Sequence, residues 1–279
     1  MELLCIFAAL AVLFLFCAFL TLKCNLHAAL APLSALGIAV AWLTATGMAK
    51  LLLPGTVLLW AVFAGSGVWA LVPHKGQHPA YRRLVTPGAV LFWGVALAFA
   101  VYFFIRQPLA TKYDELSLWA TAVKVTKADN RLYALATLGT PWPQTQNPGL
   151  PLLSYFFQFL GHYADWKIYV AYDVLAAAVF AAVLGGLNFR QYRIAVPLAA
   201  ICWFAPWFLT VYNHTIYLDT TYMTAYGDVP PGLALAARVA LWLALRKTGG
   251  PKLGRTAGTG AGGQHQGQHL CAVPGGGGG

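Results

Sequence analysis

Long apolar segments alternate with short polar ones along most of the chain. Seven of the apolar segments are long enough to cross the hydrocarbon core of a bilayer, which takes about 18–20 residues. These segments are 3–22, 28–46, 51–72, 87–105, 168–187, 194–212 and 229–245. In lipid each must be helical, because its backbone groups can be satisfied only within the segment. The pattern predicts an all-α, polytopic transmembrane protein.

The composition supports a membrane location. Hydrophobic residues make up 59% of the 279 residues and charged residues only 9%, which excludes a soluble domain. The first apolar segment follows Met1-Glu2 with no basic residue before it, so we expect a retained span and not a cleaved signal peptide. We therefore expect residues 1–248 to form a multi-span domain in the cell membrane.

The basic residues predict the orientation. The net charge is +10, and Lys75, Arg82 and Arg83 share the short loop 73–86. Because basic loops favour the cytoplasmic side, this charge indicates topology and not nucleic-acid binding. The next span then leads outward, which makes the polar segment 107–147 an external loop.

The apolar run 149–160 leaves two topologies open, because it is shorter than a span. If it crosses the membrane, Arg190 and Arg193 lie outside. If it dips in and returns, both arginines lie inside, and Asp219 and Asp228 share the outer side with Asp114. The second topology agrees better with the distribution of basic residues, and we favour it.

The last segment, 249–279, differs in composition from the rest. It is rich in Gly and has almost no hydrophobic periodicity, so we expect a disordered tail. The change is abrupt, which favours an out-of-frame or truncated end.

The principal candidate for chemistry is the carboxylate pair Asp114-Glu115, which interrupts the apolar pattern. The residues that follow it predict an amphipathic external helix lying in the membrane interface, with its apolar face in the lipid boundary. The polar face carries Asp114, Ser117, Thr121 and Lys124, and the apolar face carries Leu116, Trp119, Ala120 and Val123.

This arrangement suits a substrate linked to a lipid phosphate. Asp114 is a candidate general base, and Glu115 is suited to orienting the acceptor or binding a divalent cation. Lys124, Lys127 and Arg131 are candidate phosphate ligands. The alternatives are structural: the two carboxylates suit the cap and first turn of a helix, and the cations suit a solvated face.

Further binding candidates combine aromatic and acidic side chains. Asp219 and Asp228 lie among tyrosines, an arrangement suited to carbohydrate recognition and equally typical of an aromatic belt. Trp119 is likewise suited either to binding a sugar or to anchoring the helix at the membrane interface. The cysteines form no CxxC pair, so the sequence predicts no disulfide framework and no zinc site. It identifies no cofactor, and it leaves open a divalent cation bound with the help of Glu115.

With these residues assembled, the chain resembles the GT-C superfamily of membrane glycosyltransferases, in particular relatives of lipid-A aminoarabinose transferases and protein mannosyltransferases. Asp114-Glu115, Trp119, Lys124 and the junction 147–152 (NPGLPL) carry the resemblance, which covers roughly residues 113–187. Many relatives have His-Pro-Pro-Leu where this chain has Asn147-Pro148-Gly149-Leu150, so no histidine role transfers. The family usually has more helices towards its C-terminus.

The resemblance implies transfer of a sugar from a polyprenyl-phosphate donor to an acceptor on the non-cytoplasmic side. It gives Asp114 the catalytic role and Glu115 the place of the second acidic residue, and Lys124 or Lys127 would stabilise the departing phosphate. The alternative is a non-enzymatic polytopic protein, such as a transporter or lipid-handling component. Transporters usually place ionisable residues within spans, where this chain has chiefly Asp173.

Overall fold

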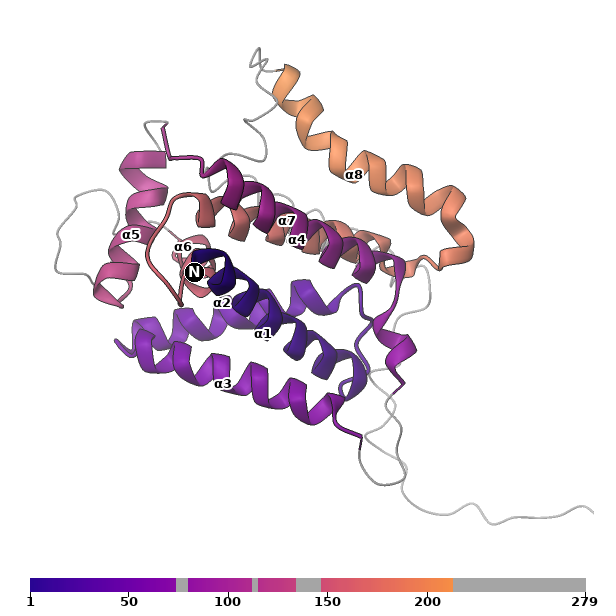
Figure 1. Ribbon diagram of the computed structural model, residues 1–279, viewed down its shortest axis with the longest axis horizontal. Coiled ribbons are helices and arrows are strands. Elements are labelled where there is room, and N and C mark those ends of the chain that lie inside the picture. The colour runs from indigo at the N-terminus through magenta and orange to yellow at the C-terminus, as the bar shows by residue number, and fades with distance from the viewer. Residues whose placement is uncertain (74–79, 112–114, 134–146, 213–279) are drawn as a thin grey trace, which may run out of the picture. The chain divides into compact units, whose positions relative to one another are not determined.

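The computed structural model describes residues 1–73, 80–111, 115–133 and 147–212, with side chains described as far as 203 (Figure 1). The described residues contain helices and no strand, which confirms the all-α prediction. The longer elements are α1 (Glu2–Leu22), α2 (Ala31–Met48), α3 (Leu52–Leu71), α4 (Pro87–Arg106), α7 (Trp166–Val183) and α8 (Tyr192–Tyr212). The shorter ones are η1 (Tyr81–Leu84), η2 (Glu115–Trp119), α5 (Ala120–Asp129), α6 (Gly149–Phe157), η5 (Leu184–Gly186) and η6 (Phe189–Gln191).

Within the described residues, five helices are long and apolar enough to cross a membrane: α1, α2, α3, α4, and α7 with its extension to Gly186. The chain is therefore a multi-pass membrane protein. The predicted segment 194–212 falls within α8. The predicted span 229–245 and the tail 249–279 lie outside the described residues.

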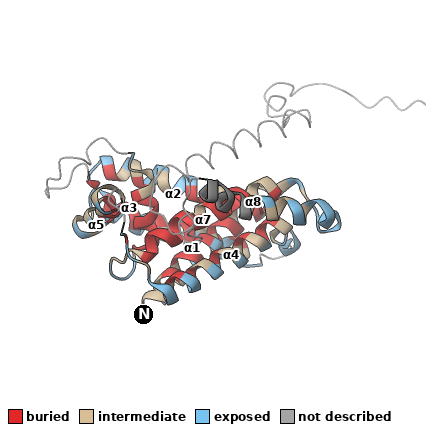
Figure 2. Cartoon of the chain, turned by 90° about the horizontal axis from the view of Figure 1, so that it is seen from above, coloured by how far each residue is buried: buried red, intermediate tan, exposed pale blue. Residues whose placement is uncertain are grey.

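The helix α7 is the most deeply buried of the five candidate spans. Of its most apolar stretch, 78% is buried, against 33% for α3 and for α4. Figure 2 shows buried residues concentrated on α1 and α7, with exposed residues along the outer helices. Large exposed side chains on α3 and α4, such as Val62, Trp69 and Leu97, are those that would contact lipid.

Antiparallel packing of α4 against α7 fixes where the intervening segment begins and ends. Gly88, at the start of α4, lies so close to α7 that an added Cβ would be 2.7 Å from the carbonyl oxygen of Ala181. At the other end, the Phe103 and Tyr169 rings are 5.9 Å apart. Just beyond, the Ala110 N–H donates to Asp165 Oδ2 at 3.1 Å. The end of α4 therefore lies beside the start of α7.

The short helix α6 does not cross the bundle. Its nine residues measure about 14 Å at ~1.5 Å per residue, roughly half of a bilayer core of about 30 Å. Because α7 begins where α4 ends, the segment that contains α6 returns to the end from which it started. A Cβ on Gly149 would contact Val40, midway along α2, at 3.5 Å. The helix thus occupies part of the depth of the bundle, which agrees with the favoured topology, in which this run dips and returns.

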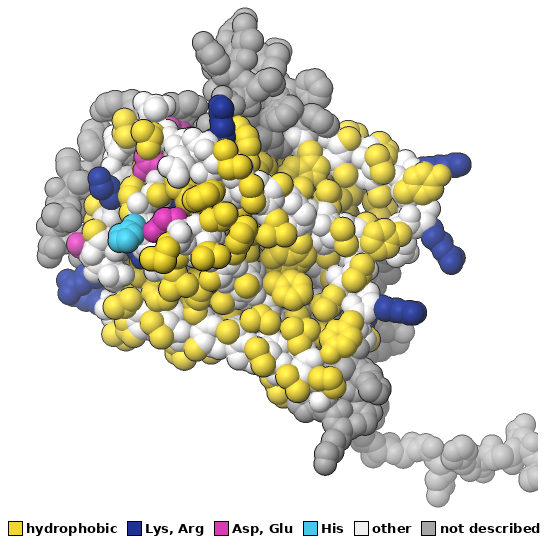
Figure 3. All heavy atoms as spheres, viewed as in Figure 1, with side chains coloured by type: hydrophobic (Ala, Val, Ile, Leu, Met, Phe, Trp, Pro, Cys, Tyr) yellow, Lys and Arg dark blue, Asp and Glu magenta, His cyan; other side chains and the backbone are white. Residues whose placement is uncertain are grey.

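The two ends of the bundle carry different kinds of charged side chain. We call the end where α1 starts, α4 ends and α7 begins the polar end, because it holds Glu2, Glu115, Asp129 and Asp165 together with several cations. The opposite end, defined by the loops before α4 and after α7, we call the basic end. In Figure 3 the acidic and histidine side chains gather on one side of the visible face, and Lys and Arg alone project from the other. Among the described charged residues, the basic end carries Lys23, Arg82, Arg83, Arg190 and Arg193.

A pair of glycines in α3 tests the packing of α1 against α3. A Cβ on Gly67 would overlap the Leu15 backbone, whereas a Cβ on Gly65 would meet nothing within 4 Å. We expect Gly67→Ala to lower the free energy of unfolding by about 1–3 kcal/mol, because the helices must move apart. Gly65→Ala is the matched control and should leave stability unchanged or slightly raised. Denaturant unfolding of the two variants in detergent measures the difference, and equal stabilities would contradict the packing.

Candidate functional site

Glu115 lies inside the polar end and not on its surface. It opens the π-helical turn η2, and only 1% of its surface is exposed. Its Oε2 accepts the Thr111 backbone N–H at 3.4 Å, and the Tyr169 side chain of α7 forms a further hydrogen bond with it. The carboxylate thus links η2 to the end of α4 and the start of α7.

The other predicted residues occupy different environments. Lys124 and Arg131 are exposed, and Trp119 is half-buried against the hydrophobic core. These three remain available at the surface of the polar end. One short segment, made of η2, α5 and the residues just after it, carries five of the predicted residues: Glu115, Trp119, Lys124, Lys127 and Arg131. Asp114, Asp219 and Asp228 lie outside the described residues.

Lys127 already has a structural partner. Its Nζ donates to the carbonyl oxygen of Phe159 at 2.7 Å, just beyond the end of α6. Its ammonium also lies 5.9 Å from the centres of the Tyr155 and Phe159 rings. Burial lowers the pKa of Lys127, and the nearby positive charge of Lys167 lowers it further. A cation placed here stabilises the carbonyl end of α6, whereas Lys124 and Arg131 are exposed.

The apolar face of α5 packs on the protein's own α6, not on lipid. Ala120, Ala122, Val123 and Thr126 are buried, while Lys124 is exposed. The Tyr155 hydroxyl of α6 donates to Asn130 Oδ1 at 2.7 Å, directly after α5. Of the predicted apolar face, Ala120 and Val123 are thus covered by the protein, whereas Leu116 is 52% exposed and Trp119 half-buried.

A cluster that sequence reasoning missed joins the first residues of the chain to α7. Lys167 is fully buried, and its Nζ donates to Glu2 Oε2 and, at 2.6 Å, to the His162 carbonyl oxygen. The other oxygen of Glu2 lies 3.2 Å from His162 Nδ1. Gly161, at φ +82°, leaves room for this carboxylate, because an added Cβ would lie 2.6 Å from Glu2 Oε2.

The sequence does indicate this cluster at one point, because Lys167 is a lysine at the edge of an apolar run. A buried ammonium needs an anionic partner, because an unpaired charge is costly in the interior. The partner is 165 positions away in the sequence. No local pattern could identify it.

The loop between α6 and α7 completes the polar end. The Tyr163 hydroxyl donates to the Ala120 carbonyl oxygen at 3.3 Å, and burial together with the Asp165 carboxylate raises the pKa of Tyr163. Asp165 itself accepts the Ala110 N–H. The loop therefore contacts both the residues after α4 and the start of α5. These contacts hold in place the segment that carries the candidate residues.

The described residues contain no group of three or more His, Cys, Asp or Glu side chains that could hold a metal ion.

No family model, curated protein or solved structure matches this chain. What the structure and these comparisons establish together is a helical protein with five candidate membrane spans.

The ion pair between the buried Lys167 and the partly exposed Glu2 gives a stability prediction. We expect Glu2→Gln to lower the free energy of unfolding by about 1–3 kcal/mol, because it leaves the buried Lys167 ammonium without its anion. Adding Lys167→Met should recover part of that loss, since no charge then remains buried. Unfolding in detergent measures all three variants, with exposed Lys124→Met as the control. Additive losses in the double variant would contradict the coupling.

Proposed function

We propose that the protein is a membrane glycosyltransferase that transfers a sugar from a polyprenyl-phosphate donor to an acceptor on the non-cytoplasmic side. The observation that carries the proposal is the return of the segment between α4 and α7 to the polar end. It puts a buried carboxylate, Glu115, and two exposed cations, Lys124 and Arg131, at one membrane surface. The phosphate group of a lipid lies at the membrane surface, whereas the membrane-spanning helices carry almost no charged residues.

Each candidate residue has its own role in the proposed reaction. The acceptor hydroxyl attacks the anomeric carbon of the sugar, and its proton passes to Asp114 as general base. The bond between the anomeric carbon and the phosphate oxygen breaks, and polyprenyl phosphate leaves with the electron pair. Lys124 and Arg131 stabilise the phosphate by charge-assisted hydrogen bonds. Glu115, held by the Thr111 N–H, positions the neighbouring Asp114.

The sugar itself would contact the aromatic and acidic candidates. Trp119, half-buried at the base of α5, offers a ring face. Asp219 and Asp228 belong to the same proposal as hydrogen-bond acceptors for sugar hydroxyls.

The distribution of charge supports the sidedness of the proposal. Arg82, Arg83, Arg190 and Arg193 share the basic end, and loops rich in Arg and Lys face the cytoplasm. The polar end then faces away from it. A polyprenyl-phosphate sugar presented on that leaflet would meet α5 directly.

Asp114→Asn tests the assignment. We expect it to reduce sugar transfer by about 10²–10⁴-fold, the usual contribution of a general base, while membrane insertion and unfolding stay unchanged. The assay is transfer of label from polyprenyl-phosphate sugars in proteoliposomes. Asp129→Asn, at the other end of α5, is the matched control and should retain activity. Normal transfer by the Asp114 variant would refute the proposal.

One observation favours a second candidate function, transport. Asp173 lies within α7, is only 6% exposed, and its Oδ2 has no hydrogen-bond partner among the described residues. Ionisable groups buried in spans often mark a transport pathway. Solute or proton uptake in vesicles that is lost in Asp173→Asn and kept in Asp114→Asn would establish transport in place of glycosyl transfer.

A further inference from the structure

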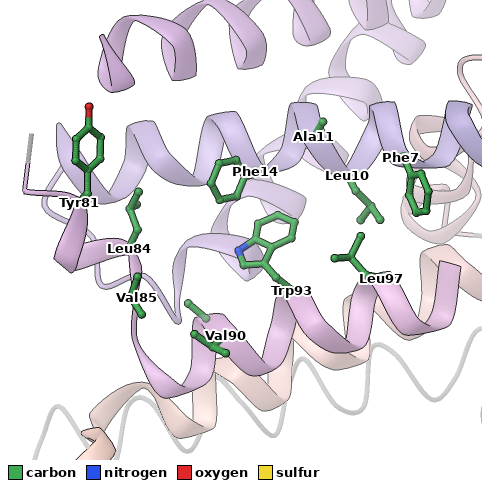
Figure 4. Close-up of a pocket in the computed structure, with 11 residues that line it drawn as sticks. Phe7, Leu10, Ala11, Phe14, Tyr81, Leu84, Val85, Val90, Trp93 and Leu97 are labelled. Atoms are coloured by element: carbon green, nitrogen blue, oxygen red, sulfur yellow. The ribbon is translucent and has the colours of Figure 1, made fainter. Parts of the chain in front are cut away.

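An apolar groove opens between α1 and α4, and residues of η1 line one end of it. Its volume is about 730 Å³, within the range of roughly 300–1,000 Å³ that is usual for ligand sites. Figure 4 shows Phe7 and Phe14 of α1 facing Trp93 and Leu97 of α4 across it. No charged residue lines it.

The groove exists because small side chains form its floor. Ala11 and Ala89 lie where larger residues would close the gap between the helices. The Phe14 and Trp93 rings meet edge to face, 5.3 Å apart, and give the groove a rigid centre. Its rim is open: Phe14 is 39% exposed and Leu97 45% exposed. In a multi-pass protein such an opening faces lipid.

One end of the groove is closed by a short basic helix. Tyr81 and Leu84 of η1 line that end, and Arg82 and Arg83 lie between them in the sequence and are exposed. Two hydrogen bonds hold η1 in place. The Tyr81 hydroxyl donates to the Leu71 carbonyl oxygen at 2.7 Å, and Arg83 donates to Asn25 Oδ1 at 2.8 Å. Arg82 is exposed and follows Tyr81, so its guanidinium lies outside the apolar lining, next in the chain to the residue at that end of the groove.

We propose that this groove binds one acyl chain of an anionic phospholipid of the cytoplasmic leaflet, with the lipid phosphate on Arg82. The apolar lining matches the chain, and a guanidinium matches a phosphate in charge and geometry. The basic end faces the cytoplasm by the distribution of Arg and Lys, and anionic lipids are enriched on that side. The site is separate from the proposed active site at the polar end and does not depend on glycosyl transfer.

Native mass spectrometry of the purified full chain with phosphatidylglycerol or phosphatidylcholine tests the proposal. We expect one tightly retained lipid with a preference of about tenfold for phosphatidylglycerol, the effect of one hydrogen bond to a charged group. Arg82→Gln should abolish the preference. Arg193→Gln, an exposed arginine at the same end but outside the groove, is the matched control and should keep it.

A second pair of variants tests the groove itself. Leu97→Trp narrows the groove and should weaken retention of both lipids, whereas Val62→Trp, on the exposed face of α3, should not. Equal retention of the two lipids by the unaltered protein would overturn the proposal. So would displacement of phosphatidylglycerol by polyprenyl phosphate at equal concentration, because the groove would then serve the isoprenoid.

Discussion

The antiparallel packing of α4 against α7 is the constraint on which the rest of the structure depends. Gly88 allows the start of one helix to meet the end of the other, and at the far end Phe103 lies against Tyr169. With both helices fixed in this way, the residues between them must leave and return at the same end. The short α6, the turn η2 and α5 all follow from that requirement, and so does the gathering of acidic residues at the polar end.

The polar end is held by contacts between segments that are distant in sequence. Glu2 meets Lys167, Ala110 meets Asp165, and Lys127 meets the carbonyl group that follows α6. Each contact places a polar group where water is partly excluded, and each supplies the partner that such a group requires. These contacts hold the polar end together, and Lys124 and Arg131 are exposed at its surface.

Sequence reasoning located the spans well because the bilayer demands long apolar helices. The first, third and fourth segments agree with α1, α3 and α4 to within about two residues, the usual uncertainty of helix ends. The second begins later, at Ala31, because the preceding residues form a turn in which Ala29 N–H donates to His27 Nδ1. The environments of Glu115 and Lys127 were beyond prediction, since they depend on Tyr169 and Phe159 in distant segments.

The central claim, that the residues between α4 and α7 return to one side of the membrane, is tested most directly by cysteine accessibility. In a cysteine-free background, Lys124→Cys and Arg190→Cys would each be exposed to a membrane-impermeant maleimide in sealed, oriented vesicles. The structure predicts that the two positions react from opposite sides, because α7 alone crosses between them. Labelling of both from the same side would mean that α6 also crosses, and it would contradict both the architecture and the active site that we propose.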